Sequence, residues 1–167
     1  RDNGWFNANE KLKEVVAGIE DTNVDNYDEV LPLFVYGTDE KSKAATPDLE
    51  KCIDKCSLVI ERHTMSIEGK EKNKWIDDAW FVIAKSHFYK RNFYEAERGF
   101  AYIGKRFKDQ NRQLESQIWT ARTAIVLEQY GKAQSALDQV RDLKKIPKDL
   151  DLSELDAVYA ELNLKRG

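Results

Sequence analysis

A set of small and large apolar residues recurs across the middle of the chain at a fixed offset of 37 residues, the spacing between Ala84 and Ala121. This recurrence constrains the fold more than any single residue does. The first copy comprises Ala84, Phe88, Phe93, Ala96, Phe100 and Ile103, and the second comprises Ala121, Ile125, Tyr130, Ala133, Leu137 and Val140. A helix pair with one apolar face cannot bury that face alone, so such pairs stack on their neighbours. The pattern therefore predicts an all-α helical solenoid.

The stretch from Asp78 to Asp109 resembles one tetratricopeptide repeat, a unit of two antiparallel helices. The usual pattern of this repeat places Trp and a small residue on the first helix, and Ala followed by an aromatic residue on the second. Trp80, Ala84 and Ala96 stand at three of these positions. The resemblance implies a right-handed solenoid of about seven helices, or about three and a half repeats. Such a solenoid is a binding module, and the repeat pattern alone does not name its partner.

Apolar periodicity and capping signals together predict where the helices lie. Thr46 is expected to cap a helix with Pro47 at its first position, and Asn92 and Gly131 are expected at the tight turns within the helix pairs. Pro147 is expected to end the second repeat. The predicted helices run from about Trp5 to Glu20, Thr46 to Met65, Ile76 to Lys90, Tyr94 to Arg106, Arg112 to Tyr130, Lys132 to Lys144 and Ser153 to Leu164.

Residues 1–167 are expected to form a single helical repeat domain with a long insertion at about residues 21–45. The apolar run from Leu31 to Tyr36 within this insertion is expected to pack against the solenoid. Asp151 and Glu154 resemble a capping box for the last helix. We expect that helix to have no partner within the chain, because solenoids normally end in a polar cap and this helix carries an apolar stripe of Leu155, Val158, Tyr159 and Leu162. The chain also opens at Arg1 without a Met, so we expect a fragment of a longer repeat protein.

Composition disfavours two classes of partner. Charged residues make up 34% of the chain and the formal net charge is -3, so there is no overall basic field for nucleic acid. No apolar run approaches the roughly 20 residues that a membrane helix needs. We therefore expect other proteins as partners, no nucleic acid, and no direct membrane insertion of this segment.

The residue types that usually carry catalysis or metal binding are few. Cys52 and Cys56 share one helical face without a second ligand pair, and a step of 40 residues back from Ala96 makes Cys56 a buried packing residue. His63 and His87 are the two histidines, and His87 takes a position where the repeat usually has Tyr. There is no phosphate-binding loop and no nucleophile elbow. We therefore expect no enzyme activity, no catalytic residues, no metal and no cofactor.

The candidate site is the concave wall that the first helices of the repeats would line. Lys85 and Arg122 share one position in the repeat and could receive a partner carboxylate, with neighbouring apolar residues supplying contact area, although both could equally be solvating residues. The complete predicted partner-binding groove is Phe81, Lys85, Phe88, Tyr89, Ile118, Arg122, Ile125 and Val126. Trp75 and Tyr102 fall outside the packing pattern and are predicted to be exposed contacts.

Four landmarks in order along the chain resemble the N-terminal repeat region of the PorW/SprE-type outer-membrane lipoproteins. They are the opening Gly4 to Leu12, the run Leu31 to Gly37, the predicted helix Lys51 to Met65 with its ending His63 to Ile67, and the segment Asn73 to Trp80. This family belongs to the type IX secretion and gliding motility machinery of Bacteroidota. The resemblance implies a non-catalytic, periplasm-facing scaffold in the cell envelope, with a lipid anchor that would lie outside this segment.

Two other classes stay open. The chain could be another tetratricopeptide adaptor, either an outer-membrane assembly lipoprotein of the BamD kind or a cytosolic adaptor. It could also be an accessory that binds a small molecule or peptidoglycan, which would need a pocket enclosed by the insertion.

Overall fold

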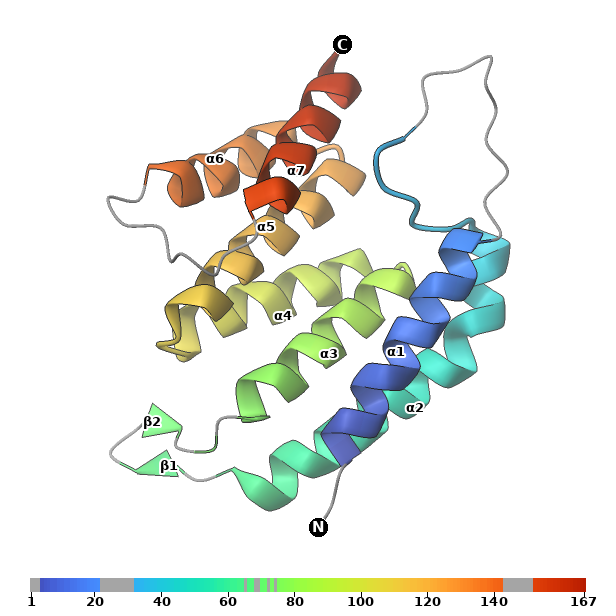
Figure 1. The fold of residues 1–167 in the computed structure, drawn as a ribbon, viewed down its shortest axis with the longest axis vertical. Helices are drawn as coiled ribbons and strands as arrows, with labels where there is room; N and C mark the ends of the chain where they lie inside the picture. Colours follow the sequence, from blue (N-terminus) through green and yellow to red (C-terminus); the bar gives the residue numbers. More distant parts are fainter. Residues whose placement is uncertain are drawn as a thin grey trace. The chain divides into compact units, whose positions relative to one another are not determined.

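The computed structural model describes residues 4–21, 32–64, 66, 67, 70, 71, 73, 75–142 and 152–167. This part of the chain is all-α and contains seven helices, as predicted (Figure 1). A pair of two-residue antiparallel strands, β1 (Ser66–Ile67) and β2 (Lys70–Glu71), lies between the second and third helices. The helices are α1 (Gly4–Asp21), α2 (Asp39–His63), α3 (Trp75–Tyr89), α4 (Phe93–Arg106), α5 (Gln110–Val126), α6 (Tyr130–Arg141) and α7 (Leu152–Arg166).

The chain divides into two compact units, and in each of them three helices contact one another. The first contains α1, α2, α3 and the start of α4 as far as Gly99, and the second contains the rest of α4, α5, α6, α7 and the short segment Pro32–Phe34. In the first unit, α1 packs on α2 and α3 packs on both. In the second, α5 packs on α6 and α7 packs on both. Each unit therefore contains three helices that all contact one another, and the expectation of one single domain stays a prediction.

The offset of 37 residues, which relates Ala84 to Ala121, reappears in the burial of the side chains. Phe93 and Tyr130 are both half-buried. The other five pairs are fully buried, namely Ala84 and Ala121, Phe88 and Ile125, Ala96 and Ala133, Phe100 and Leu137, and Ile103 and Val140. The packing role of the repeated residues is thus confirmed.

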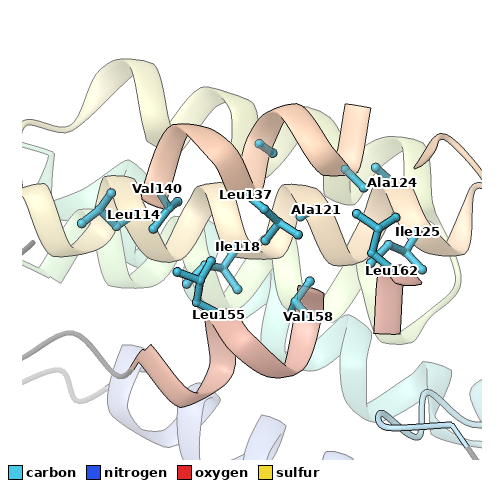
Figure 2. Close-up of a cluster of buried hydrophobic side chains, with 12 residues drawn as sticks. Leu114, Ile118, Ala121, Ala124, Ile125, Leu137, Val140, Leu155, Val158 and Leu162 are labelled. Carbon is cyan, nitrogen blue, oxygen red and sulfur yellow. The ribbon is translucent and has the colours of Figure 1, made fainter. Parts of the chain in front are cut away.

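The same offset extends into α7, beyond the two copies recognised in the sequence. Leu155, Val158 and Leu162 follow Ile118, Ala121 and Ile125 by 37 residues and are at most 5% exposed. Figure 2 shows these side chains of α7 directed toward those of α5 within one apolar cluster. The prediction that the last helix has no partner within the chain is therefore wrong, because α5 and α6 cover its apolar stripe.

The turns inside the two helix pairs repeat as well, bond for bond. The N–H groups of Arg91 and Asn92 donate to the carbonyls of Phe88 and His87 at 2.9 Å. The N–H groups of Glu128 and Gln129 donate to the carbonyls of Ile125 and Ala124 at 3.0 and 2.8 Å, which is the same pattern 37 residues later. Both turns therefore end their first helix in the same Schellman geometry.

The left-handed residue in each turn is not the one that the sequence pattern predicts. Arg91 has φ 64° and Glu128 has φ 59°, whereas Asn92 follows the first turn and Gly131 lies inside α6. The Schellman pattern places the left-handed residue before the Asn or Gly that the sequence pattern favours.

Glu128→Gly is expected to stabilise the protein by about 0.5–1 kcal/mol, because glycine adopts positive φ without the Cβ clash that glutamate suffers. Chemical denaturation measures the change. Glu128→Ala keeps the Cβ and serves as the control, with an expected change close to zero. Equal stability changes for the two substitutions would show that loss of the glutamate side chain, rather than relief of the backbone conformation, causes the change.

α2 begins earlier than predicted. It starts at Asp39, and the Thr38 side chain caps it by accepting the N–H of Lys41 at 3.4 Å, so the prediction of a start at Thr46 is wrong. Asp39 and Glu40 add an acidic first turn that favours the positive end of the helix dipole. Pro47 consequently lies inside the helix rather than at its first position.

This earlier start shortens the predicted insertion. Residues 39–45 are helical, and residues 32–38 precede the helix. Residues 22–31 of the insertion, the predicted helix ends at Met65 and Lys144, Pro147 and the Asp151 half of the capping box lie outside the described residues.

Candidate functional site

The structure corrects the predicted groove, because six of its eight residues lie in the interior. Their exposed fractions are 6% for Phe81, 1% for Phe88, 4% for Tyr89, 1% for Ile118, 7% for Arg122 and 4% for Ile125. Lys85 and Val126 are half-buried. The face of α5 that was expected to line an open wall is covered by α7 within the second unit.

In the first unit, Phe88 is the centre of a ring cluster. Its ring meets those of Tyr36, Tyr89 and Phe93 edge to face, with centroids 4.8, 5.4 and 5.4 Å apart. Tyr36 comes from the apolar run before α2, so the expectation that this run packs on the helices is confirmed for Tyr36. Phe88 and Tyr89 thus form core rather than a groove surface.

In the second unit, Arg122 lies between two aromatic rings. Its guanidinium carbon is 3.9 Å from the ring centroid of Trp119 and 4.2 Å from that of Phe34. Arg122 Nη1 donates to Glu154 Oε1 at 2.8 Å. The guanidinium that was expected to receive a partner carboxylate is therefore already bound to a carboxylate of the chain itself.

Glu161, on the helix that carries Glu154, is a second buried charge in this region. It is 2% exposed, and its Oε2 accepts the backbone N–H of Leu33 at 2.9 Å. Sequence reasoning missed Glu161, although its place three residues after Val158 and one before Leu162 puts it next to the apolar face of its helix.

Lys85 has a different environment from its counterpart Arg122. Its ammonium lies 4.9 Å from the ring centroid of Phe81, and the residue is half-buried. The shared repeat position therefore does not produce a shared role in the two units.

Several large aromatic side chains are exposed. Trp75 is 60% exposed and Tyr102 is 42% exposed, which confirms the predicted exposure of both. Tyr94, at 67%, was missed. A signal for it existed, since its counterpart 37 residues later is Gly131, which carries no packing side chain.

A shallow hollow of about 650 Å³ lies between α1 and α2. Lys11 forms ion pairs with Glu14 and Asp48 at 3.2 Å in each case, and Lys51 pairs with Asp48 at 3.0 Å. Hydrogen bonds from Lys51 and then Lys11 lower the pKa of Asp48. These charges neutralise one another on the surface and do not form an acid and base pair. The lining residues are Phe6, Asn7, Glu10, Lys11, Glu14, Asp48, Lys51, Cys52 and Lys55.

The cysteines are free and buried, as predicted. Cys52 Sγ donates to the carbonyl of Ala8 at 3.4 Å, and burial raises the pKa of Cys56 to about 12. A thiol with so high a pKa is a poor nucleophile at neutral pH.

His87 is half-buried, and desolvation lowers its pKa, which favours the neutral ring. His63 is exposed. Within the described ranges, no group of three or more His, Cys, Asp and Glu side chains could hold a metal ion. None of the described helices combines the length and apolar character that a membrane crossing requires.

A polar cluster joins α6 to α7 around Asp138. Asp138 Oδ1 accepts the Tyr159 hydroxyl at 2.7 Å and the Gln134 amide at 3.0 Å, and Arg141 Nη2 lies 3.0 Å from the same oxygen. The hydrogen bond from Tyr159, followed by that from Gln134, lowers the pKa of Asp138. Burial, and then the bond to Asp138, raises the pKa of Tyr159 to about 12, so the phenol stays a donor.

Acid is expected to remove the contribution of Asp138 to stability. Because its pKa is lower in the folded state than the ordinary value of 3.8, the contribution is complete above about pH 4 and disappears as the pH falls through the folded value. The stability difference between wild type and Asp138→Asn should therefore be largest near neutral pH and shrink below about pH 4. Denaturation at a series of pH values checks this. Asp156→Asn, on the exposed side of α7, removes one charge without the Tyr159 bond, and an identical pH curve for both variants would contradict the prediction.

No protein-family model matches the sequence, and a search of curated proteins gives no significant match.

Proposed function

We propose that this chain is a non-catalytic protein–protein interaction scaffold, built as a right-handed solenoid of tetratricopeptide-type helix pairs. The observation that carries the proposal is the double recurrence at 37 residues, in burial and in the hydrogen bonds of the Arg91 and Glu128 turns. A recurrence of both packing and turn geometry is the signature of a repeat unit, and stacked repeat units serve mainly to present binding surfaces.

The exposed aromatic residues support a binding role. Trp75, Tyr94 and Tyr102 each expose more than two fifths of their surface on helices that are otherwise well packed. Rigid aromatic side chains supply a large contact area at low entropic cost, and they are enriched at the centres of protein interfaces.

The proposal has a narrower form, in which the scaffold belongs to the type IX secretion or gliding machinery on the periplasmic side of the outer membrane. This form rests on the sequence landmarks at Gly4 to Leu12 and Leu31 to Gly37. Its partners would be secretion or envelope proteins, with no cofactor and no nucleic acid, and its lipid anchor would lie outside residues 1–167.

A crosslinking pull-down from the native cell envelope tests both forms, using the full-length protein as wild type and as the double variant Trp75→Ala, Tyr102→Ala. Leu58→Ala, also an exposed apolar residue at 46%, serves as the control. We expect wild type and the control to recover secretion components and the double variant to lose them. Recovery of cytosolic partners alone would exclude the narrower form, and recovery of no partner would count against a scaffold of either kind.

A further inference from the structure

The segment Pro32–Phe34 belongs to a different unit from the segments on either side of it. The residues before it, in α1, and after it, from Val35, belong to the first unit, whereas the segment itself belongs to the second. Pro32 and Leu33 are exposed, the latter by 49%, and Phe34 is half-buried. Phe34 packs against the apolar cluster of α5, α6 and α7, and it is the least exposed of the three residues.

Two interior charged side chains contact this segment. Glu161, at 2% exposure, accepts the N–H of Leu33, and Arg122, at 7% exposure, stacks on the ring of Phe34. Arg122 also stacks on the ring of Trp119 and donates to Glu154. The segment is thus bound through two contacts, a hydrogen bond from the backbone N–H of Leu33 and a stacking contact of the Phe34 ring.

Packing alone does not account for this arrangement. Burying a carboxylate and a guanidinium costs free energy that apolar residues of similar size would not cost. Their chemistry instead suits recognition, since a carboxylate can accept a backbone N–H of a peptide segment and a guanidinium on a Trp ring offers a flat surface for a second aromatic ring.

We propose that Trp119, Arg122, Glu154 and Glu161 form a binding site for a short linear peptide, which Pro32–Phe34 occupies as an intramolecular ligand. The peptide that the site accepts carries an aromatic side chain directly after a residue with a free backbone N–H. A partner protein that supplies such a segment displaces Pro32–Phe34. This inference rests on the proposed scaffold function and names the chemistry of one partner.

A linear partner segment fits this site better than a second copy of the chain does. In each copy, the residues after Phe34 are fixed to the first unit, because Tyr36 packs on Phe88 and the carbonyl of Gly37 accepts from Arg91 at 3.2 Å. A second copy would have to bring these attachments with it, whereas a linear segment carries none.

Fluorescence anisotropy with a labelled peptide of residues 31–37, sequence LPLFVYG, tests the proposal on the full chain. In wild type the tethered segment competes at an effective concentration of about millimolar, so the peptide should bind weakly. Phe34→Ala removes the ring contact and should bind the peptide at least about tenfold more tightly than wild type. Leu33→Ala keeps the backbone N–H and the Phe34 ring, and as the matched control it should bind like wild type.

Two altered peptides test the two recognition elements separately. A peptide with Leu33→Pro lacks the N–H that Glu161 accepts, and a peptide with Phe34→Ala lacks the ring, so each should bind the Phe34→Ala protein at least about tenfold less tightly. Adding Glu161→Gln to that protein should also weaken binding of the unaltered peptide. Circular dichroism establishes that each protein variant is folded.

A folded Phe34→Ala protein that binds the peptide no better than wild type would overturn the proposal, as would equal binding of the Leu33→Pro peptide. A concentration-dependent dimer of wild type that is lost in Phe34→Ala would assign the site to a second copy and also overturn it. The peptide assay contains no envelope protein, so the two proposals can fail separately. If the peptide does not bind but the pull-down succeeds, only the peptide-site inference is overturned. If the peptide binds but the pull-down recovers no partner, only the proposed scaffold function is overturned.

Discussion

Replacing Leu162 with alanine is expected to lower the free energy of unfolding by about 2–5 kcal/mol, the range for truncating a buried leucine. Leu162 is fully buried in the cluster that α7 forms with α5 and α6 (Figure 2). Leu164→Ala, on the same helix at 48% exposure, is the matched control and should change stability by less than about 0.5 kcal/mol. Urea denaturation of the three proteins measures both values.

This pair of substitutions asks whether α7 belongs to the core of the second unit. Similar small effects of Leu162→Ala and Leu164→Ala would mean that α7 is not packed on α5 in solution. The helix would then have the uncovered apolar stripe that the sequence pattern predicts.

Phe88→Ala is expected to cost about 3–5 kcal/mol, because it removes a ring that is 1% exposed and leaves a cavity among Tyr36, Tyr89 and Phe93. Phe6→Ala removes a ring of the same size that is 51% exposed on α1 and should have a much smaller effect. Thermal and urea unfolding compare the two. A loss below about 1 kcal/mol for Phe88→Ala would contradict its place in the core and restore it as a candidate groove residue.

Leu162→Ala and Phe88→Ala fall in different units, so measuring both tests the single-domain prediction. If the units unfold as one cooperative transition, both variants shift the same midpoint. Two separate transitions, each shifted by one substitution, would mean that the chain contains two independently unfolding units.

The helices could be predicted well from the sequence because burial along a helix follows a local period. Ala96, Phe100 and Ile103 lie on one face whatever the partner of that face is, so the recurrence at 37 residues was enough to identify them as core. The same reasoning applied to α7 would have identified Leu155, Val158 and Leu162 as core.

The offset that relates the packing residues of α2 to those of α4 was predicted less well. A step of 40 residues back from Phe93 and Phe100 leads to Ile53 and Ile60, and these are only half-buried. The buried residues are Leu49, Cys52, Cys56 and Val59, which precede Phe93, Ala96, Phe100 and Ile103 by 44 residues. Cys56 is buried under both alignments, and for that reason it could not distinguish them.

The start of α2 was missed because two capping signals compete in the sequence. Thr46 with Pro47 is a standard start, but Thr38 followed by Asp39 and Glu40 is a start as well, and a helix that begins at Thr38 can continue through Thr46. A single proline did not stop this helix, although proline in a helix interior is usually costly.

The candidate site could not be predicted, because a periodic pattern shows which face of a helix is apolar but not which element covers it. Arg122 and Lys85 share a position in the repeat, yet Arg122 stacks on Phe34, which lies 88 residues earlier in the chain. Contacts at such a separation depend on the path of the loop, and local sequence does not encode that path.

The two thiols have a practical consequence for the kinetics of this protein. Cys52 and Cys56 are the complete cysteine content of the chain, and both belong to α2 in the first unit. Since Cys56 is fully buried, a thiol reagent can modify it only as fast as that unit opens. The rate of cysteine labelling therefore reports the rate at which the first unit opens, and the measurement needs no introduced probe.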